Sequence, residues 1–529
     1  MVEGITNTGG VCGPYFDVFP SGGWRCGEFV NGGSNHSWLP KDKAFKKPGS
    51  LMTDSSMLAP ELGWGLVTCL GVLWILLGWL WGRKAKTEEG FTLAGRKVGL
   101  ALGGATTMAT WVTSNTTMLA PVFAYKFGLW GMLAYSTASF GLFLFALFLP
   151  RIRELLPQGV TAGDFFHLRY GKIGWVIFLI ITITNSTSWL VSMAIAGGDL
   201  LESLAGIPYV QGMSIILLVC VGYTLFGGMY AVIGTDFIQS ILILLGILVI
   251  GYLVWGQLDM EDTHTYLSEY QPSLLLWVMP AALLAVFNNL LFGFGEVFHN
   301  NVWWSRAFAI RKECAPKAFT LAGFLWFPIP IAAGFIALAA GPLGINIAQE
   351  NQTGPTVAAA VLGSTGLGMW GGVLILTVLF CSMASSIDSL LAATSDLLFK
   401  DITGKVLGRA PEKENFRKVT SVVIILVGGV TWLLALPHWP IINVLFLSGP
   451  LVGSLIWPVI AGLFWDGLNR KLVLVGIGLG SVCGLISYFT IGWFVASLVG
   501  TAVSMIFTLL SRKFRPMPFP PTYQPVSST

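Results

Sequence analysis

The feature that most constrains this chain is a series of long, uninterrupted apolar runs. Residues 62–82, 131–150, 241–255 and 422–436 meet or approach the roughly 20 residues that a helix needs to cross the hydrocarbon core of a bilayer. Charged residues make up only 11% of the chain and apolar residues 54%. Because lipid offers no hydrogen-bond partner to an open backbone, these runs predict an all-α polytopic membrane protein.

Lysine and arginine residues gather in alternate connections between the apolar runs. Their clusters lie near 83–97, 151–172, 306–317, 400–418, 470–471 and 512–515, whereas 258–272, 341–354 and 437–440 hold none. Basic residues mark the cytoplasmic side of short loops. We therefore expect about 13 transmembrane helices in the plasma (inner) membrane, with the N-terminus outside and the C-terminus in the cytoplasm.

The composition of the chain changes at four points and so divides it into five segments. An extracellular or periplasmic tail precedes the first transmembrane helix with its cytoplasmic loop; a ten-helix transport core, two C-terminal helices and a cytoplasmic tail follow. Their expected bounds are 1–60, 61–97, 98–466, 467–511 and 512–529. Cys12 and Cys26 in the outer tail form a disulfide or stay free.

Two core spans contain polar residues where a regular helix is expected. The first core span contains residues 113–117 (TSNTT), and the sixth contains Asn288, Asn289 and then residues 293–296 (GFGE). Non-helical backbone at membrane depth survives where it is buried in protein or lines a cavity. The first and sixth spans correspond in a five-plus-five inverted repeat, which favours a secondary transporter with sites beside broken helices. Each patch alone could equally be a contact between packed helices.

Three motifs resemble the sodium:solute symporter family, in its order and spacing. Residues 91–97 (FTLAGRK) are similar to the (A/G)GR motif before the first core span of the family. Residues 227–239 resemble its GG-x-x-A-V-x-x-T-D-x-x-Q signature, and residues 381–395 resemble its serine-rich eighth core span. The resemblance runs from about residue 62 to residue 512 and implies a transporter coupled to an ion gradient.

The resemblance also implies a sodium site between the first and eighth core spans. Hard cations take oxygen ligands, and an unwound helix exposes carbonyl oxygens. Matching the motifs residue by residue assigns the carbonyls to Ala109, Val112 and Ser382 and the hydroxyls to Ser385 and Ser386. Adjacent serines in a membrane helix can also serve helix packing. Sodium is the expected coupling ion, and no other metal and no organic cofactor is expected.

Some family members have a second ion position, which this chain would form from Asp236, Asp388 and Ser389. A carboxylate within the membrane is costly unless it is paired or binds a cation, so it indicates a functional site. Two neighbouring carboxylates would hold a second sodium ion or share a proton and so permit proton coupling. Alternatively, Asp236 forms a structural ion pair with a basic loop at the cytoplasmic mouth.

Residues 304–330 resemble the urea active transporter branch of the family. Urea offers N–H donors and one carbonyl acceptor, so it suits a compact site lined by carbonyls and hydroxyls. The expected function is therefore sodium-coupled import of a small polar solute, with urea as the expected solute. The expected partners are the solute, the sodium ion and the lipid bilayer, and no nucleic acid. The expected substrate-binding residues are Trp111, Asn115, Thr116, Trp189, Asn288 and Glu296.

Glu296 departs from the urea branch, which has a small hydroxyl residue at this place. It either contacts the substrate or forms a buried ion pair. With Asp199 and Glu202 near the outer end of the third core span, it leaves choline-like or polyamine cations open, as well as proton-coupled uptake. His299 is either a packed histidine or a proton relay.

Other classes of function are less well supported. The sequence has no HExxH, GxSxG or CxxC motif, so we expect no enzyme and assign no catalytic residue. A transporter-like membrane sensor that acts through a separate partner is the alternative from a different class.

Overall fold

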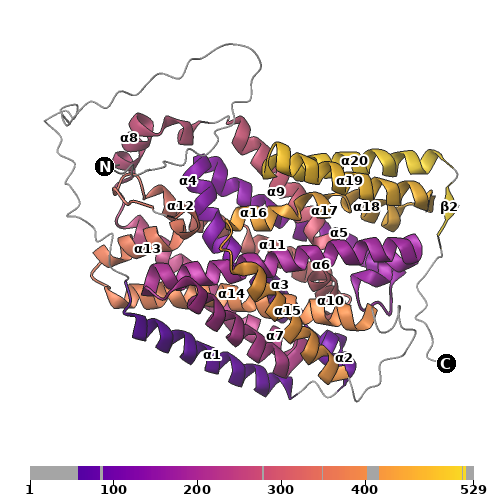
Figure 1. Ribbon diagram of the computed structural model, residues 1–529, viewed down its shortest axis with the longest axis horizontal. Coiled ribbons are helices and arrows are strands. Elements are labelled where there is room, and N and C mark those ends of the chain that lie inside the picture. The colour runs from indigo at the N-terminus through magenta and orange to yellow at the C-terminus, as the bar shows by residue number, and fades with distance from the viewer. Residues whose placement is uncertain are drawn as a thin grey trace, which may run out of the picture. The chain divides into compact units, whose positions relative to one another are not determined.

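A computed structural model describes residues 57–83, 87–276, 279–347, 349–401, 416–514 and 516–519. These residues are almost entirely helical (Figure 1). The predicted outer tail up to residue 56, with Cys12 and Cys26, lies outside the described residues.

The helices and strands follow one another through short connections. The α-helices are α1 (Pro60–Gly82), α2 (Glu88–Leu93), α3 (Leu100–Trp111), α4 (Ser114–Ser136), α5 (Phe140–Leu155), α6 (Ala162–Ala205), α7 (Tyr209–Trp255), α8 (Met260–Tyr270), α9 (Pro280–His299), α10 (Asn301–Ala309), α11 (Ala315–Trp326), α12 (Pro328–Leu338), α13 (Thr353–Ser364), α14 (Met369–Leu397), α15 (Phe416–Ala435), α16 (Ile441–Leu447), α17 (Gly449–Gly453), α18 (Ile456–Phe464), α19 (Arg470–Thr490) and α20 (Trp493–Lys513). The 3-10 helices are η1 (Ala94–Arg96), η2 (Thr137–Ser139), η3 (Pro272–Leu275) and η4 (Glu350–Gln352), and the strands are β1 (Gly467–Leu468) and β2 (Met517–Pro518).

Eleven helical segments in the described part of the chain are long and apolar enough to cross a membrane. This confirms the all-α polytopic class. One segment, Ser114–Leu155, has 42 residues, more than a single crossing requires, and the apolar helix Tyr209–Leu225 is shorter than the others. The count of 13 spans therefore stays a prediction.

Two glycines allow long helical runs to change direction. Gly128 interrupts α4 with φ 58° and ψ −135°, and Gly228 interrupts α7 with φ 55° and ψ −157°. Such backbone angles are open to glycine and strained for other residues. A Cβ on Gly128 would also lie 2.0 Å from the carbonyl oxygen of Leu274, and one on Gly228 would lie 2.6 Å from that of Phe91. The second glycine of the GG signature thus divides α7 into two helical segments, of which Gly228–Trp255 is long enough to cross a membrane.

The predicted break in the first core span is confirmed. Helix α3 ends at Trp111, Val112 leaves the helical region with ψ 80°, and α4 begins at Ser114. Thr113 is the N-cap of α4 and its hydroxyl accepts a hydrogen bond from the main-chain N–H of Thr116. The polar run therefore supplies the cap of the second helix rather than a long unwound segment.

The predicted break within the sixth core span is wrong in position. Helix α9 runs without interruption from Pro280 to His299, across the residues expected to unwind. The interruption lies at Asn300, whose backbone is extended (φ −79°, ψ 123°), and α10 begins at the next residue.

The polar and glycine residues of α9 serve close packing instead. Asn289 donates two hydrogen bonds, of 2.7 and 2.9 Å, to main-chain carbonyls of α4. A Cβ on Gly293 or Gly295 would lie 2.6 Å from a main-chain carbonyl oxygen of a neighbouring segment. These residues therefore let α9 approach other backbones, which is a common use of small residues in membrane helices.

The helices outside the core lie against it at separate places. Helix α1 packs along α7, and α19 and α20 lie side by side (Figure 1). Strand β1 pairs antiparallel with β2 and so ties the connection before α19 to the segment after α20. The predicted boundaries at 97/98 and 466/467 fall between helices.

Candidate functional site

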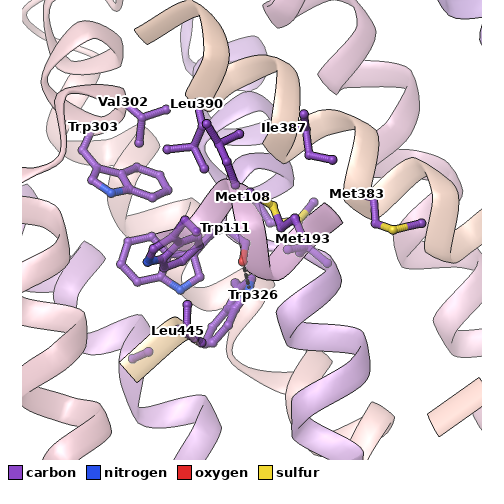
Figure 2. Packing of buried hydrophobic residues seen from close by; sticks show 14 of the residues in the cluster. Met108, Trp111, Met193, Val302, Trp303, Trp326, Met383, Ile387, Leu390 and Leu445 are labelled. Carbon is purple, nitrogen blue, oxygen red and sulfur yellow. Dashed lines mark hydrogen bonds between the residues drawn. The ribbon is translucent and has the colours of Figure 1, made fainter. Parts of the chain in front are cut away.

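The interruption between α3 and α4 frees main-chain oxygens that a continuous helix would use. The last carbonyls of a helix have no partner within it. Two side chains donate hydrogen bonds to the carbonyl oxygen of Trp111. The indole N–H of Trp326 lies at 2.8 Å (Figure 2), and the hydroxyl of Thr116 lies at 3.2 Å. Other carbonyl oxygens at the end of α3 are contacted by side chains of α14.

The structure brings together all five residues predicted to hold sodium. The Ser385 hydroxyl lies 3.1 Å from the carbonyl oxygen of Ala109, and the Ser386 hydroxyl lies 3.4 Å from that of Val112. Both hydroxyls also lie near the carbonyl oxygen of Ser382, at 3.2 and 3.1 Å. The spacing of the serines explains this, since helix positions three and four residues apart share a face.

This oxygen cluster has more hydrogen-bond acceptors than donors. Ser386 also lies 3.1 Å from the carbonyl oxygen of Thr110, which the sequence analysis did not assign to the site. Two hydroxyl protons thus face three carbonyl oxygens at the end of α3 and that of Ser382, which the regular helix α14 already pairs with a main-chain N–H; all four residues are buried. A small hard cation suits such a set, because it is attracted by every oxygen at once.

Two of the three residues predicted for a second ion, Asp236 and Ser389, contact a fourth residue, Arg306. Its Nη2 atom lies 3.2 Å from Oδ2 of Asp236 and 2.6 Å from the hydroxyl of Ser389. Asp236 also accepts a 2.5 Å hydrogen bond from Thr106, and its side chain is completely buried. The structural ion pair that was the alternative for Asp236 is therefore present, but its partner Arg306 lies in the buried helix α10 and not in an exposed loop.

The sequence analysis missed the role of Arg306 because it counted this residue among loop cations. The residue lies in α10, where the stretch 302–309 (VWWSRAFA) is apolar apart from Ser305 and Arg306. A single arginine in such an apolar stretch could have indicated a buried functional residue.

Neither carboxylate oxygen of Asp388 has a hydrogen-bond partner among the described residues.

Glu296 accepts hydrogen bonds from three neutral N–H groups. The side-chain amides of Asn185 and Asn300 donate at 2.8 and 2.7 Å, and the indole of Trp303 donates at 3.3 Å. His299 is 3.8 Å away, and its Nδ1 contacts the carbonyl oxygen of its own helix at Gly295 instead. Neutral hydrogen bonds, rather than a lysine or arginine, thus surround the buried carboxylate.

Tryptophan rings connect Glu296 to the break in the first core span. The ring centroid of Trp303 lies 4.5 Å from that of Trp111, and Trp326 contacts Trp111 edge-on at 6.1 Å (Figure 2). The predicted substrate residues Trp111 and Glu296 therefore both contact Trp303, which the sequence analysis did not name. Thr116 joins this group through its hydrogen bond to Trp111.

The other predicted substrate residues, Asn115, Trp189 and Asn288, each contact a different helix. The amide of Asn115 donates to Ser192 of α6 at 2.9 Å, and the ring of Trp189 stacks on Phe292 of α9. Asn288 instead accepts a hydrogen bond from the backbone of α20, at 3.1 Å. Asn115 Oδ1, Trp189 Nε1 and Asn288 Nδ2 are buried without a partner among the described residues. Buried polar atoms are normally satisfied, so these three are candidates for contact with water or solute.

Near the C-terminal end of α6, a histidine contacts one of the acidic residues noted in the sequence. His438, between α15 and α16, places Nε2 2.7 Å from Oδ1 of Asp199 and stacks its ring on Tyr209. The hydrogen bond to the Asp199 carboxylate raises the pKa of His438; burial opposes this rise and the negative charge of Glu202 adds to it. Asp199 is thus engaged by a side chain of the protein itself.

This contact predicts a pH-dependent stability. Because the pKa of His438 is raised in the folded state, its stabilising contribution is complete below the ordinary histidine pKa of about 6.5 and is lost as the pH rises through the raised value. We expect the melting temperature of the wild type to exceed that of His438→Gln most at acidic pH. Melting curves between pH 5.5 and 8.5 measure this, with the exposed His264→Gln as control. A difference independent of pH would contradict the prediction.

Comparison with known proteins places this geometry among transporters. The "Urea active transporter" of Saccharomyces cerevisiae is 24% identical over 466 residues, which cover 80% of this chain and 63% of that relative. The "Urea-proton symporter" of Oryza sativa subsp. japonica is 24% identical, covering 84% and 67% of the two chains. The "Sodium/proline symporter 2" of Staphylococcus saprophyticus is 28% identical, covering 75% and 80%.

A solved structure has the same fold. It is described as the substrate-bound outward-open state of a Na+-coupled sialic acid symporter, and it superposes with a TM-score of 0.72 at 18% identity. The match covers 87% of this chain and 99% of that chain. It supports the five-plus-five inverted-repeat architecture predicted from the sequence.

Residues 91–480 match the sequence profile of the "Sodium:solute symporter family". Because this match covers most of the chain, the protein belongs to the sodium:solute symporter family and is an integral membrane protein.

Proposed function

We propose that this protein is a sodium-coupled symporter that imports a small polar solute, with urea as the first candidate. The observation that carries this proposal is the oxygen cluster in which the serines of α14 face the carbonyls at the end of α3. Its excess of acceptors over donors is a reason to bind a small cation.

In this proposal, sodium binding couples to the position of the broken helix. A cation held by Ala109 and Val112 on one side and by Ser385 and Ser386 on the other bridges α3 and α14. It therefore stabilises any conformation in which these helices are close, and conformations that separate them release it. Because Trp111 lies at the same break and is a proposed solute-binding residue, this conformational preference would also change the affinity for the solute.

The choice of urea rests on the relatives and on the partnerless polar atoms. The urea transporters of yeast and rice match this chain over 80% and 84% of its length. Asn115 presents a buried acceptor without a partner among the described residues, and Trp189 and Asn288 present such donors, which are the types of group that a neutral amide needs. Glu296 already accepts three hydrogen bonds from neutral N–H groups, which leaves it fewer acceptor positions for an amine cation.

Uptake of labelled urea into proteoliposomes tests this proposal. We expect an inward sodium gradient to accelerate uptake several-fold over an equal choline gradient, and unlabelled urea to compete. A lack of urea uptake in a preparation that sodium still stabilises would exclude urea, and choline-like or polyamine cations would be tested next.

Proton coupling is the second candidate. Asp388 offers two buried carboxylate oxygens without a partner among the described residues, and one relative is named a urea–proton symporter. In the same proteoliposomes, urea uptake that follows a pH gradient and ignores sodium would favour this candidate over sodium coupling.

A further inference from the structure

One nitrogen atom of Arg306 is surrounded by oxygen atoms in the manner of a bound cation. Its Nη2 lies 2.5 Å from the hydroxyl of Thr110, 2.6 Å from the hydroxyl of Ser389 and 3.2 Å from the carboxylate of Asp236. These three oxygens come from three helices, α3, α14 and α7. Nη2 has two hydrogens but three oxygen neighbours, so hydrogen bonds cannot account for every contact. The positive charge of the guanidinium therefore contributes to holding the oxygens around it.

We propose that Arg306 is a tethered cation that fills a second cation position, so that a single mobile ion drives transport. This inference rests on the proposed function, since it concerns the number of ions that a symporter of this kind carries. Oxygens of Asp236 and Ser389 would otherwise form part of a site for a second ion. In this inference the guanidinium, which already contacts both residues, takes the place of that ion.

Arg306 is held in a fixed position, because it and its neighbours in α10 are buried and hydrogen-bonded. The Arg306 side chain is 1% exposed, and its Nη1 donates to the carbonyl oxygen of Val302 in the same helix at 3.2 Å. The neighbouring Trp304 is fully buried and donates to the carbonyl oxygen of Phe298. Unlike a sodium ion, a guanidinium fixed in this way cannot leave with the solute, and it keeps its charge at every physiological pH.

The charges of the cluster agree with one mobile cation. Asp236, Asp388 and Arg306 are all buried, and with both carboxylates ionised their formal charges sum to one negative charge. Asp388 follows Ser386 by two residues in α14, so a cation in the oxygen cluster would lie on the helix that carries the remaining carboxylate. Buried charges require such compensation. In the state with both carboxylates ionised, one ion supplies this compensation, and a second would leave an excess of positive charge.

Equilibrium binding of radioactive sodium to the purified full chain tests the inference. We expect Arg306→Met to bind one more sodium ion per chain than the wild type, because the vacated oxygens of Asp236 and Ser389 then accept an ion. The extra ion should disappear in Arg306→Met combined with Asp236→Asn, which removes the carboxylate. An unchanged number of bound ions in Arg306→Met would overturn the inference.

The inference is tested by the difference in the number of bound sodium ions between Arg306→Met and the wild type, so it can be judged separately from the proposed function. A wild type that binds no sodium would refute sodium coupling, yet a gain of one ion in Arg306→Met would still support the tethered cation. If Arg306→Met does not yield folded protein, Arg306→Gln keeps an amide donor toward Thr110 and Ser389 and carries the same expectation of one additional ion. Arg306→Lys retains the positive charge, so it should bind the wild-type number of ions, and a gain there would also overturn the inference.

Discussion

Replacing Ser386 by alanine is expected to raise the sodium concentration needed for half-maximal uptake by about 10- to 100-fold. The Ser386 hydroxyl lies within 3.4 Å of three main-chain carbonyl oxygens, so its loss removes an oxygen from the centre of the cluster. A lost polar contact to a charge costs about 1.5–3 kcal/mol, which corresponds to this change in affinity. The measurement is solute uptake as a function of sodium concentration in proteoliposomes.

Thr377→Ala is a matched control for this experiment. Thr377 lies in the same helix, but its hydroxyl donates only to the carbonyl oxygen of Val373, one turn earlier, at 2.7 Å. We expect its sodium dependence to match that of the wild type. If both variants changed alike, the effect would belong to α14 as a whole and the assignment of Ser386 would be wrong.

Replacing Asp236 by alanine is expected to lower the free energy of unfolding by about 3 kcal/mol, because Arg306 then stays buried without its ion-pair partner. This is the lower end of the usual range for a broken buried pair, since Asp388 still attracts the guanidinium. Titration with SDS in mixed micelles measures the change. The double variant Asp236→Ala/Arg306→Met removes both charges and should recover most of the loss.

An exposed ion pair provides the control for Asp236. Arg96 and Glu89 are 2.8 Å apart, and the Glu89 side chain is 59% exposed. Glu89→Gln should therefore change the free energy of unfolding by less than about 1 kcal/mol. Equal effects of Asp236→Ala and Glu89→Gln would contradict the buried ion pair described here.

The class of fold and the first break could be predicted from the sequence, because each has a local cause. Apolar runs follow from the bilayer, and Thr113 is a good helix cap in a polar run at membrane depth. The serines of α14 share a face by their spacing, but the approach of their hydroxyls to the carbonyls of α3 was expected only from the resemblance to the symporter family.

The position of the second break and the role of Arg306 depend on tertiary contacts that a local pattern does not contain. Gly293 and Asn289 have the composition of a helix break, yet neighbouring backbones use them for close approach and hydrogen bonding. Arg306 looks like a loop cation until α10 folds back between α3, α7 and α14. Trp303 was missed for the same reason, since its contacts with Glu296 and Trp111 join distant parts of the chain.

The most direct test of the central claim is the effect of sodium on the melting temperature, measured without any solute. A ligand that binds only the folded state stabilises it by about 2.7 kcal/mol at 100 times its dissociation constant. We predict that sodium chloride raises the melting temperature of the wild type and of Thr377→Ala above that in choline chloride of equal ionic strength, and that Ser386→Ala loses most of this rise. An equal rise in Ser386→Ala, or no rise in the wild type, would contradict a sodium site at the break between α3 and α4.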